Sequence, residues 1–130
     1  MPKKQKVTPE FEYRLILGTH IDELRQVPFT RVILETTKLF ASFRYELSVE
    51  ERITGKEIHY TILGLKAPHL SLPASGTGQF IRDYELLKGK RTFVVENLDG
   101  TTNAFVVQFT PKHINVLQSP KHPFVELVIT

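Results

Sequence analysis

The sequence predicts an all-β fold, and two features of it carry that prediction. Apolar and polar side chains alternate from Leu39 to Glu50 and again from Ile58 to Ile62, which puts every second residue on one face of a pleated strand. A second pair of β-prone runs, 92–97 and 103–109, is joined across Asp99-Gly100, where glycine accepts the positive φ of a tight hairpin turn. We therefore predict an antiparallel two-sheet β-sandwich of about seven to nine strands, with a partly closed β-barrel as the alternative.

The first third of the chain predicts two shorter strands. Phe11, Tyr13, Leu15 and Leu17 alternate with polar residues, which indicates a strand that ends at Gly18. Residues 20–26 fit either a turn of helix or a crossover between sheets. Residues 31–36, after Pro28, are rich in β-branched side chains and predict a second strand.

The main hairpin has a predicted register. If Thr54 and Gly55 are the two loop residues, Val49 lies opposite Tyr60, Arg52 opposite Glu57, and Glu50 opposite His59. A register slipped so that Glu50 faces Glu57 is disfavoured, because like charges repel across strands.

The last part of the chain predicts three more strands. Residues 80–87 fit a short helix or a strand, and we favour the strand. Residues 114–117 and 124–129 are the last two strands. The final one carries one charge and no proline, so as a free edge it would aggregate. We expect it to pair inside the sheet or across a homodimer interface.

Residues 76–110 resemble part of a known family. Their pattern is Gly78-x-Phe80, Leu87-Lys88-Gly89, Phe93-Val94-Val95, Asp99-Gly100, Asn103 and Phe105-Val106-Val107. This pattern resembles the later strands of bacterial immunoglobulin-like or fibronectin-III-like β-sandwich modules. The resemblance implies an immunoglobulin-like sandwich and a strand over residues 80–86, and it implies no functional residue. The chain departs from that family in having no tryptophan and no cysteine.

Composition and charge narrow the class of protein. The 130 residues carry a net charge of +3, but without Lys3, Lys4 and Lys6 the 14 remaining basic residues equal the 14 acidic ones. We predict a flexible basic tail over residues 1–9 and a single domain over 10–130. Nucleic-acid binding is disfavoured, because basic and acidic residues are interspersed. No apolar run is long enough to span a membrane and no signal peptide is evident, so the expected location is the cytoplasm.

No motif predicts catalysis, a metal or a cofactor. The five histidines lack metal-ligand spacing; His113 and His122 lie in two copies of Pro-Lys-His, at 111–113 and 120–122. A small hydrolase-type enzyme would use a His/carboxylate pair, and His59 facing Glu50 is the available pair, with Ser48 and Thr61 on the same face. An exposed sheet face provides no oxyanion hole, so charge pairing is favoured.

The candidate binding site is the segment from Gly64 to Gly78. It is long for a connection in a β-domain, and such loops are often functional. The predicted binding residues are Lys66, His69, Ser71, Ser75 and Thr77. We predict a non-enzymatic binding or protein-interaction module for a protein or small ligand. The alternative is a structural subunit that forms a homo-oligomer.

Overall fold

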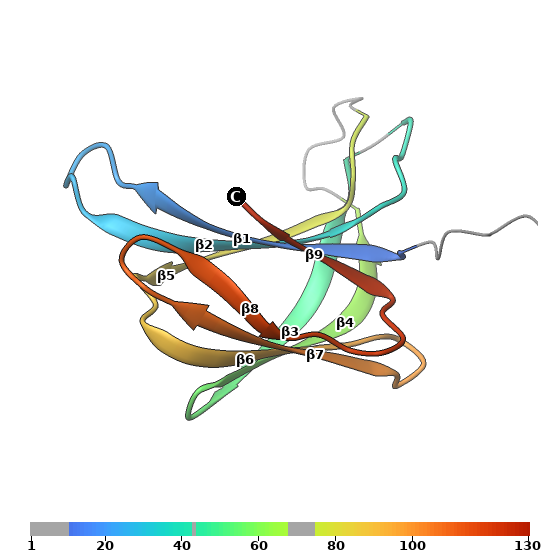
Figure 1. The fold of residues 1–130 in the computed structure, drawn as a ribbon. Helices are drawn as coiled ribbons and strands as arrows, with labels where there is room; N and C mark the ends of the chain where they lie inside the picture. Colours follow the sequence, from blue (N-terminus) through green and yellow to red (C-terminus); the bar gives the residue numbers. More distant parts are fainter. Residues whose placement is uncertain (1–10, 43, 68–74) are drawn as a thin grey trace, which may run out of the picture.

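Nine β-strands form a single sheet (Figure 1). The computed structural model describes residues 11–42, 44–67 and 75–130, so the predicted basic tail over 1–9 lies outside the described residues. The strands are β1 (Tyr13–Ile21), β2 (Pro28–Thr36), β3 (Glu46–Thr54), β4 (Glu57–Lys66), β5 (Gln79–Glu85), β6 (Gly89–Glu96), β7 (Thr102–Phe109), β8 (Ile114–Gln118) and β9 (Val125–Ile129). The all-β prediction is confirmed. Within the described ranges, no helix has the length and hydropathy needed to cross a membrane.

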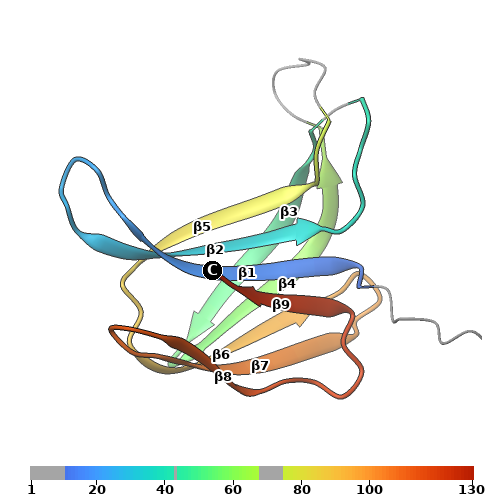
Figure 2. The same cartoon turned by 45° about the horizontal axis from the view of Figure 1, so that its top comes forward.

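The sheet curls into a nearly closed barrel rather than splitting into two layers. Its strand order is β8-β7-β6-β4-β3-β5-β2-β1-β9, so β8 and β9 are its two ends (Figure 2). Of the two predicted architectures, the partly closed barrel is therefore the observed one. Two parallel pairings distinguish this barrel from a sandwich. β4 pairs in parallel with β6, from the pair Glu57–Thr92 to the pair Thr61–Glu96, and β9 pairs in parallel with β1. These pairs join strand groups that a sandwich would keep apart.

The β3–β4 hairpin exists, but its predicted register is wrong by two residues. Thr54 pairs with Glu57, Arg52 with His59, and Val49 with Ile62, so Gly55 and Lys56 form the loop. Gly55 has a φ of 60°, whereas Lys56 does not have a positive φ. This pattern matches a type II′ turn, which has glycine at its first loop position. A two-residue shift keeps every side chain on its predicted face but changes its partner.

Of the predicted strand from Leu39 to Glu50, the described residues before Glu46 (39–42, 44 and 45) form no regular strand pairing. Regular pairing of β3 begins at Glu46, and before it Phe40 forms an isolated bridge with Gly76. The Phe40 ring packs edge-on against Tyr45 with centroids 4.9 Å apart, and Leu39 is exposed. Alternation alone therefore overestimated the length of this strand, because a strand also needs a neighbouring backbone to pair with.

The other predicted elements match more closely. Residues 79–85 form strand β5, and 114–118 form β8. The Asp99-Gly100 turn joins β6 to β7, with a φ of 88° at Gly100. β1 continues past Gly18 to Ile21 and returns antiparallel into β2, so no crossover lies between them. The loop contains one turn closed by an i→i+4 hydrogen bond from the Gln26 N–H to the Asp22 carbonyl, which matches the predicted turn of helix. The final strand, β9, pairs with β1 along one edge, but its other edge is an end of the sheet, so the prediction that it lies inside the sheet is wrong.

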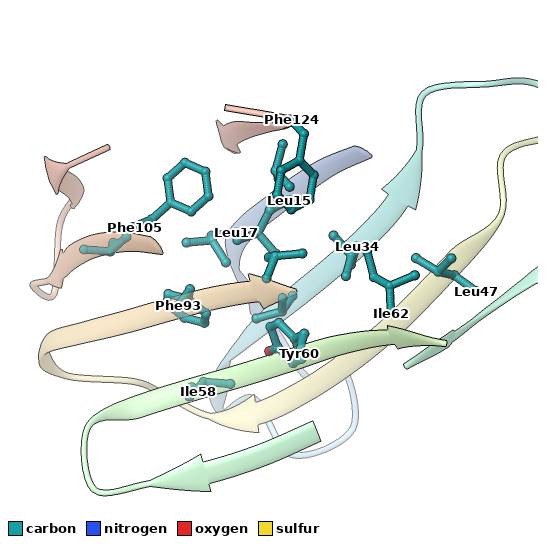
Figure 3. Packing of buried hydrophobic residues seen from close by; sticks show 14 of the residues in the cluster. Leu15, Leu17, Leu34, Leu47, Ile58, Tyr60, Ile62, Phe93, Phe105 and Phe124 are labelled. Carbon is teal, nitrogen blue, oxygen red and sulfur yellow. The ribbon is translucent and has the colours of Figure 1, made fainter. Parts of the chain in front are cut away.

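The inner face of the barrel is filled by large apolar side chains (Figure 3). Tyr60, Phe93 and Phe105 are among the largest fully buried or nearly fully buried side chains, and they come from β4, β6 and β7. Tyr60 packs on Phe93 and Phe80 with ring centroids 6.4 and 5.5 Å apart. In the described part of the chain, no buried side-chain polar atom lacks a hydrogen-bond partner.

Backbone pairing is incomplete at two places around the barrel. β3 and β5 share a single residue pair, Glu46 with Gln79, and we call this place the β3–β5 seam. β8 and β9 are the ends of the sheet and do not pair with each other; this is the β8–β9 seam. Each seam exposes backbone or side-chain groups that a closed ladder would cover.

Candidate functional site

The described structure contains three of the five predicted binding residues, so the predicted site stays a prediction. Lys66 is exposed at the end of β4. It pairs with Glu46 of β3, which pairs on its other side with Gln79 of β5. Ser75 is exposed, and His69 and Ser71 lie outside the described residues. The Thr77 hydroxyl is taken by a structural contact described next.

Thr77 belongs to a cluster around Glu35, a nearly buried carboxylate on β2 that is 7% exposed. Glu35 accepts hydrogen bonds from the Thr77 hydroxyl at 3.0 Å and the Gln79 amide at 2.8 Å. It also forms an ion pair with Arg14 at 2.6 Å, and Arg14 reaches Glu126 on β9 at 3.3 Å. The carboxylate is therefore fully partnered, as a buried charge must be, and the cluster ties β9, β1, β2 and β5 together.

The predicted pair of His59 and Glu50 is wrong. Because of the register shift, Glu50 lies opposite Thr61, and His59 lies opposite Arg52. The His59 ring instead lies 3.1 Å from a Glu96 oxygen on β6 and 4.0 Å from Glu57. No hydroxyl is hydrogen-bonded to His59 among the described residues, so the arrangement lacks the nucleophile that a hydrolase of this type needs.

A pocket lies elsewhere, at the end of the barrel where β1, β2 and β5 meet. The pocket has a volume of about 930 Å³ and is lined by the β1–β2 loop, the adjoining ends of β1 and β2, the end of β5 and the start of the β5–β6 connection. This volume lies within the range of small-ligand sites in proteins, about 300–1,000 Å³. We did not predict a binding site at this position from the sequence.

One wall of the pocket is the β1–β2 loop, which is held in one conformation by its own hydrogen bonds. An oxygen of the Asp22 carboxylate accepts from the backbone N–H groups of Leu24 and Arg25 at 2.9 and 3.1 Å. The Asp22 N–H donates to Val27 at 2.9 Å, and the Gln26 N–H donates back to Asp22 at 2.7 Å. The hydrogen bonds from Arg25 and Leu24 hold the pKa of Asp22 below its ordinary value.

This ordered loop presents apolar side chains to solvent. Leu24 at its tip is 97% exposed, and Ile21 and Val27, which line the pocket, are also exposed. Gln26 has a φ of 56°, which only a few per cent of non-glycine residues adopt. A fixed loop with a protruding leucine is a ready contact for an apolar partner group.

The outer faces of β1, β2 and β5 form the floor of the pocket. The His20 and Phe29 rings stack with centroids 5.8 Å apart. The Arg31 guanidinium lies 5.3 Å from the Phe29 centroid and donates two hydrogen bonds to Asp83, at 2.7 and 3.0 Å. The Arg31 hydrogen bond holds the pKa of Asp83 below its ordinary value and raises that of Arg31.

The charges around the pocket are only partly paired. Arg31 is paired with Asp83, and Arg25 lies 3.4 Å from Asp22. Three further charged residues line the pocket without an ion pair to any described residue: the carboxylates of Glu23 and Glu85 and the ammonium of Lys88. The unpaired charge is therefore negative by one unit.

A chain of polar groups lies behind the pocket, on the inner side of β5. The hydroxyl of Tyr84, one of the residues that line the pocket, donates to Glu51 on β3 and lies 2.7 Å from the Tyr60 hydroxyl in the core. Arg82 lies 3.4 Å from the same carboxylate. Burial, followed by the hydrogen bond to Glu51, raises the pKa of Tyr84. These side chains bridge the β3–β5 seam, where the backbone provides one pair.

The sequence contains only weak indications of this pocket. The apolar residues Ile21, Leu24 and Val27 in an otherwise polar turn were a usable sign of a contact loop. The alignment of Arg31 with Asp83 needed the β2–β5 register, which no local pattern encodes.

The described ranges contain no group of three or more His, Cys, Asp or Glu side chains placed to hold a metal ion.

A scan against protein-family models finds no matching family, and searches of curated proteins and of solved structures find no match either. The resemblance of residues 76–110 to immunoglobulin-like modules therefore stays a prediction.

Proposed function

We propose that this protein is a non-enzymatic binding module that holds a basic peptide segment in the pocket beside the β1–β2 loop. One observation carries the proposal: a pocket of about 930 Å³ joins exposed apolar side chains to unpaired carboxylates. Such a lining suits a segment in which leucine or another apolar residue neighbours arginine or lysine.

The chemistry of the lining supports a cationic group on the ligand. Glu23 and Glu85 have no cation of their own, and only Lys88 opposes them. A ligand cation would pair with these carboxylates, while the apolar group beside it would contact Ile21 and Val27. Contact with the apolar side chains supplies affinity, and the charges supply orientation and selectivity.

The state of the polar groups supports binding over catalysis. Asp22 is committed to the loop backbone, Asp83 to Arg31, and the Tyr84 hydroxyl to Glu51. Among the described residues, those that line the pocket include no serine, threonine or cysteine that would act as a nucleophile. His20 stacks on Phe29 and makes no hydrogen bond with a described carboxylate, so no base is oriented for proton transfer.

The test is a titration with a synthetic blocked hexapeptide that alternates leucine and arginine, followed by amide chemical shifts. We expect shifts at residues 21–27 and 83–88. The double variant Glu23→Gln/Glu85→Gln should weaken binding by about threefold to tenfold, as expected for two partly exposed ion pairs. Glu46→Gln, an exposed carboxylate at the start of β3, is the matched control and should leave the affinity unchanged.

Two outcomes would contradict the proposal. In the first, the peptide causes no shifts at millimolar concentration, or causes them away from the pocket. In the second, a peptide with glutamate in place of arginine binds equally well, which would show that the unpaired carboxylates do not select the ligand.

A further inference from the structure

β8 is the least covered strand of the barrel. It pairs with β7 along one edge only, and its other edge is an end of the sheet. Ile114 is half-buried and its other four residues are exposed, including Val116 and Leu117 at 43% and 47%. An unpaired strand edge is a template for the backbone of another strand.

The inner face of the barrel is also uncovered beside β8. Val116 pairs with Val107 and Ile114 pairs with Phe109, so each points to the same side as its buried partner. Val107 is fully buried, yet Val116 remains exposed because no strand lies beyond it. Across the β8–β9 seam, Ile129 of β9 is also exposed. β8 and β9 do not pair with each other, and Figures 1 and 2 show them lying apart, joined by the connection that follows β8. One more strand along β8 would cover Val116.

The charge around β8 is of one sign. Residues 100–125 contain no aspartate or glutamate, and their only lysines, Lys112 and Lys121, bracket the strand. Each lysine is followed by a histidine, His113 or His122, in the two Pro-Lys-His copies. Neither lysine forms an ion pair with a described residue. A turn in which the Thr110 N–H donates to the His113 carbonyl at 2.9 Å fixes one end. The edge therefore has an uncharged centre and two positive ends.

These charges decide between two possible occupants. An antiparallel pair of two β8 strands would bring Lys112 of one copy towards Lys121 of the other, and residues 100–125 contain no carboxylate that could pair with them. Like charges facing each other across strands are destabilising. A strand with acidic residues at both ends would meet both lysines favourably and would pair with β8 through its backbone.

We propose that the free edge of β8 is a docking site for an extended segment of another protein, with an uncharged β-prone centre and acidic residues at both ends. The segment adds a strand to the sheet and covers Val116. At about 3.3 Å per residue, about ten residues reach from one lysine to the other. This site is separate from the pocket, which prefers a basic segment, so the two proposals stand or fall independently.

The probe is a blocked ten-residue peptide of alternating valine and threonine with two acidic residues at each end. Its counterpart carries lysines in the acidic positions. We expect the acidic peptide to shift the amides of Ile114–Gln118, to give cross-strand contacts with β8, and to bind at least tenfold more tightly than its counterpart. Its affinity should fall as salt rises, because the selective contacts are exposed charges.

The matched variant is Lys112→Glu/Lys121→Glu, which changes two exposed residues and should reverse the preference between the peptides. Lys112→Gln/Lys121→Gln should abolish the preference and keep the thermal midpoint, which tests the charges if the reversed variant folds poorly. Glu23→Gln/Glu85→Gln should leave acidic-peptide binding unchanged.

Three results would overturn the proposal. The two peptides bind with equal affinity, or neither binds at millimolar concentration, or the protein alone is a dimer with cross-strand contacts between two β8 strands. The last result would identify a second copy of this chain as the occupant.

Discussion

The two seams of the barrel are closed by different means. At the β3–β5 seam, the backbone provides one pair, and Glu51, Arg82 and Tyr84 bridge the rest. At the β8–β9 seam, side chains close only the end near Asn103 of β7, whose amide oxygen accepts from the N–H groups of Phe124 and Val125 at 2.8 and 3.1 Å. Beyond that point β8 is open.

The different ways in which the two seams are closed indicate different roles for them. Charged and phenolic side chains that satisfy one another hold strands in place without a backbone ladder. At the β8–β9 seam the uncovered groups are apolar side chains and a strand edge, and no strand of the described ranges pairs with that edge. The first seam is therefore closed by its own side chains, and the second is where we propose that a partner strand docks.

The largest expected effect is at the closed end of the β8–β9 seam. Phe124 is buried, packs edge-on against Tyr13, and its carbonyl accepts hydrogen bonds from Glu12 and Tyr13. Phe124→Ala should lower the free energy of unfolding by about 3–5 kcal/mol, as other buried phenylalanines do. Urea denaturation measures it. A loss below about 1 kcal/mol would contradict this account of the seam.

Asn103 should have the next largest effect. It is 2% exposed, and Asn103→Ala would leave the N–H groups of Phe124 and Val125 without their acceptor. An orphaned buried donor costs about 1–3 kcal/mol, which urea denaturation resolves. Asn115→Ala on β8 is the matched control, because that asparagine is exposed and should have little effect. Equal losses at the two positions would remove the distinction between closed and open ends.

The β3–β5 seam predicts a pH dependence. Burial, followed by the neighbouring Tyr84, raises the pKa of Tyr60 above its ordinary value. The native state therefore keeps this proton while the unfolded chain loses it, and stability that is present below a pH of about 10 is lost as the pH rises further. The slope should reach about 1.4 kcal/mol per pH unit for this group. Urea denaturation from pH 9 to 11 should show a shallower decline for Tyr60→Phe, and identical slopes would contradict the prediction.

The smallest expected effect is on β8 itself. Val116→Ser replaces an inward-facing but exposed side chain, so the free energy of unfolding should change by no more than about 0.5 kcal/mol. Thermal denaturation checks it. A loss comparable to that of Phe124→Ala would show that Val116 is already covered in the free protein.

Local patterns in the sequence predicted the elements but not how they come together. The Asp99-Gly100 turn and the alternation over residues 58–62 predicted strands β4, β6 and β7, because both signals are local. The β3–β4 register depended on which loop position holds Gly55, and alternation is unchanged by a shift of two residues. The barrel itself depends on the parallel pairing of β4 with β6 and of β1 with β9, and long-range pairing leaves no local pattern.

The candidate sites were less predictable than the strands. The loop 64–78 stood out by its length, yet Thr77 contributes to the Glu35 cluster and Lys66 stands apart. The pocket depends on Arg31 meeting Asp83 across two strands distant in sequence. The recurrence of Pro-Lys-His at 111–113 and 120–122 was visible, but its meaning needed the knowledge that the strand between the copies has a free edge.

Hydrogen exchange of the free protein, followed residue by residue, tests the open seam most directly. We predict that amides of β7, which pairs with β6 on one side and with β8 on the other, exchange only through global unfolding. Amides of β8 that point away from β7 should exchange close to the rate of an unstructured peptide. If every amide of Ile114–Gln118 is protected as strongly as those of Thr102–Phe109, the edge of β8 is already covered and the proposed docking site is wrong.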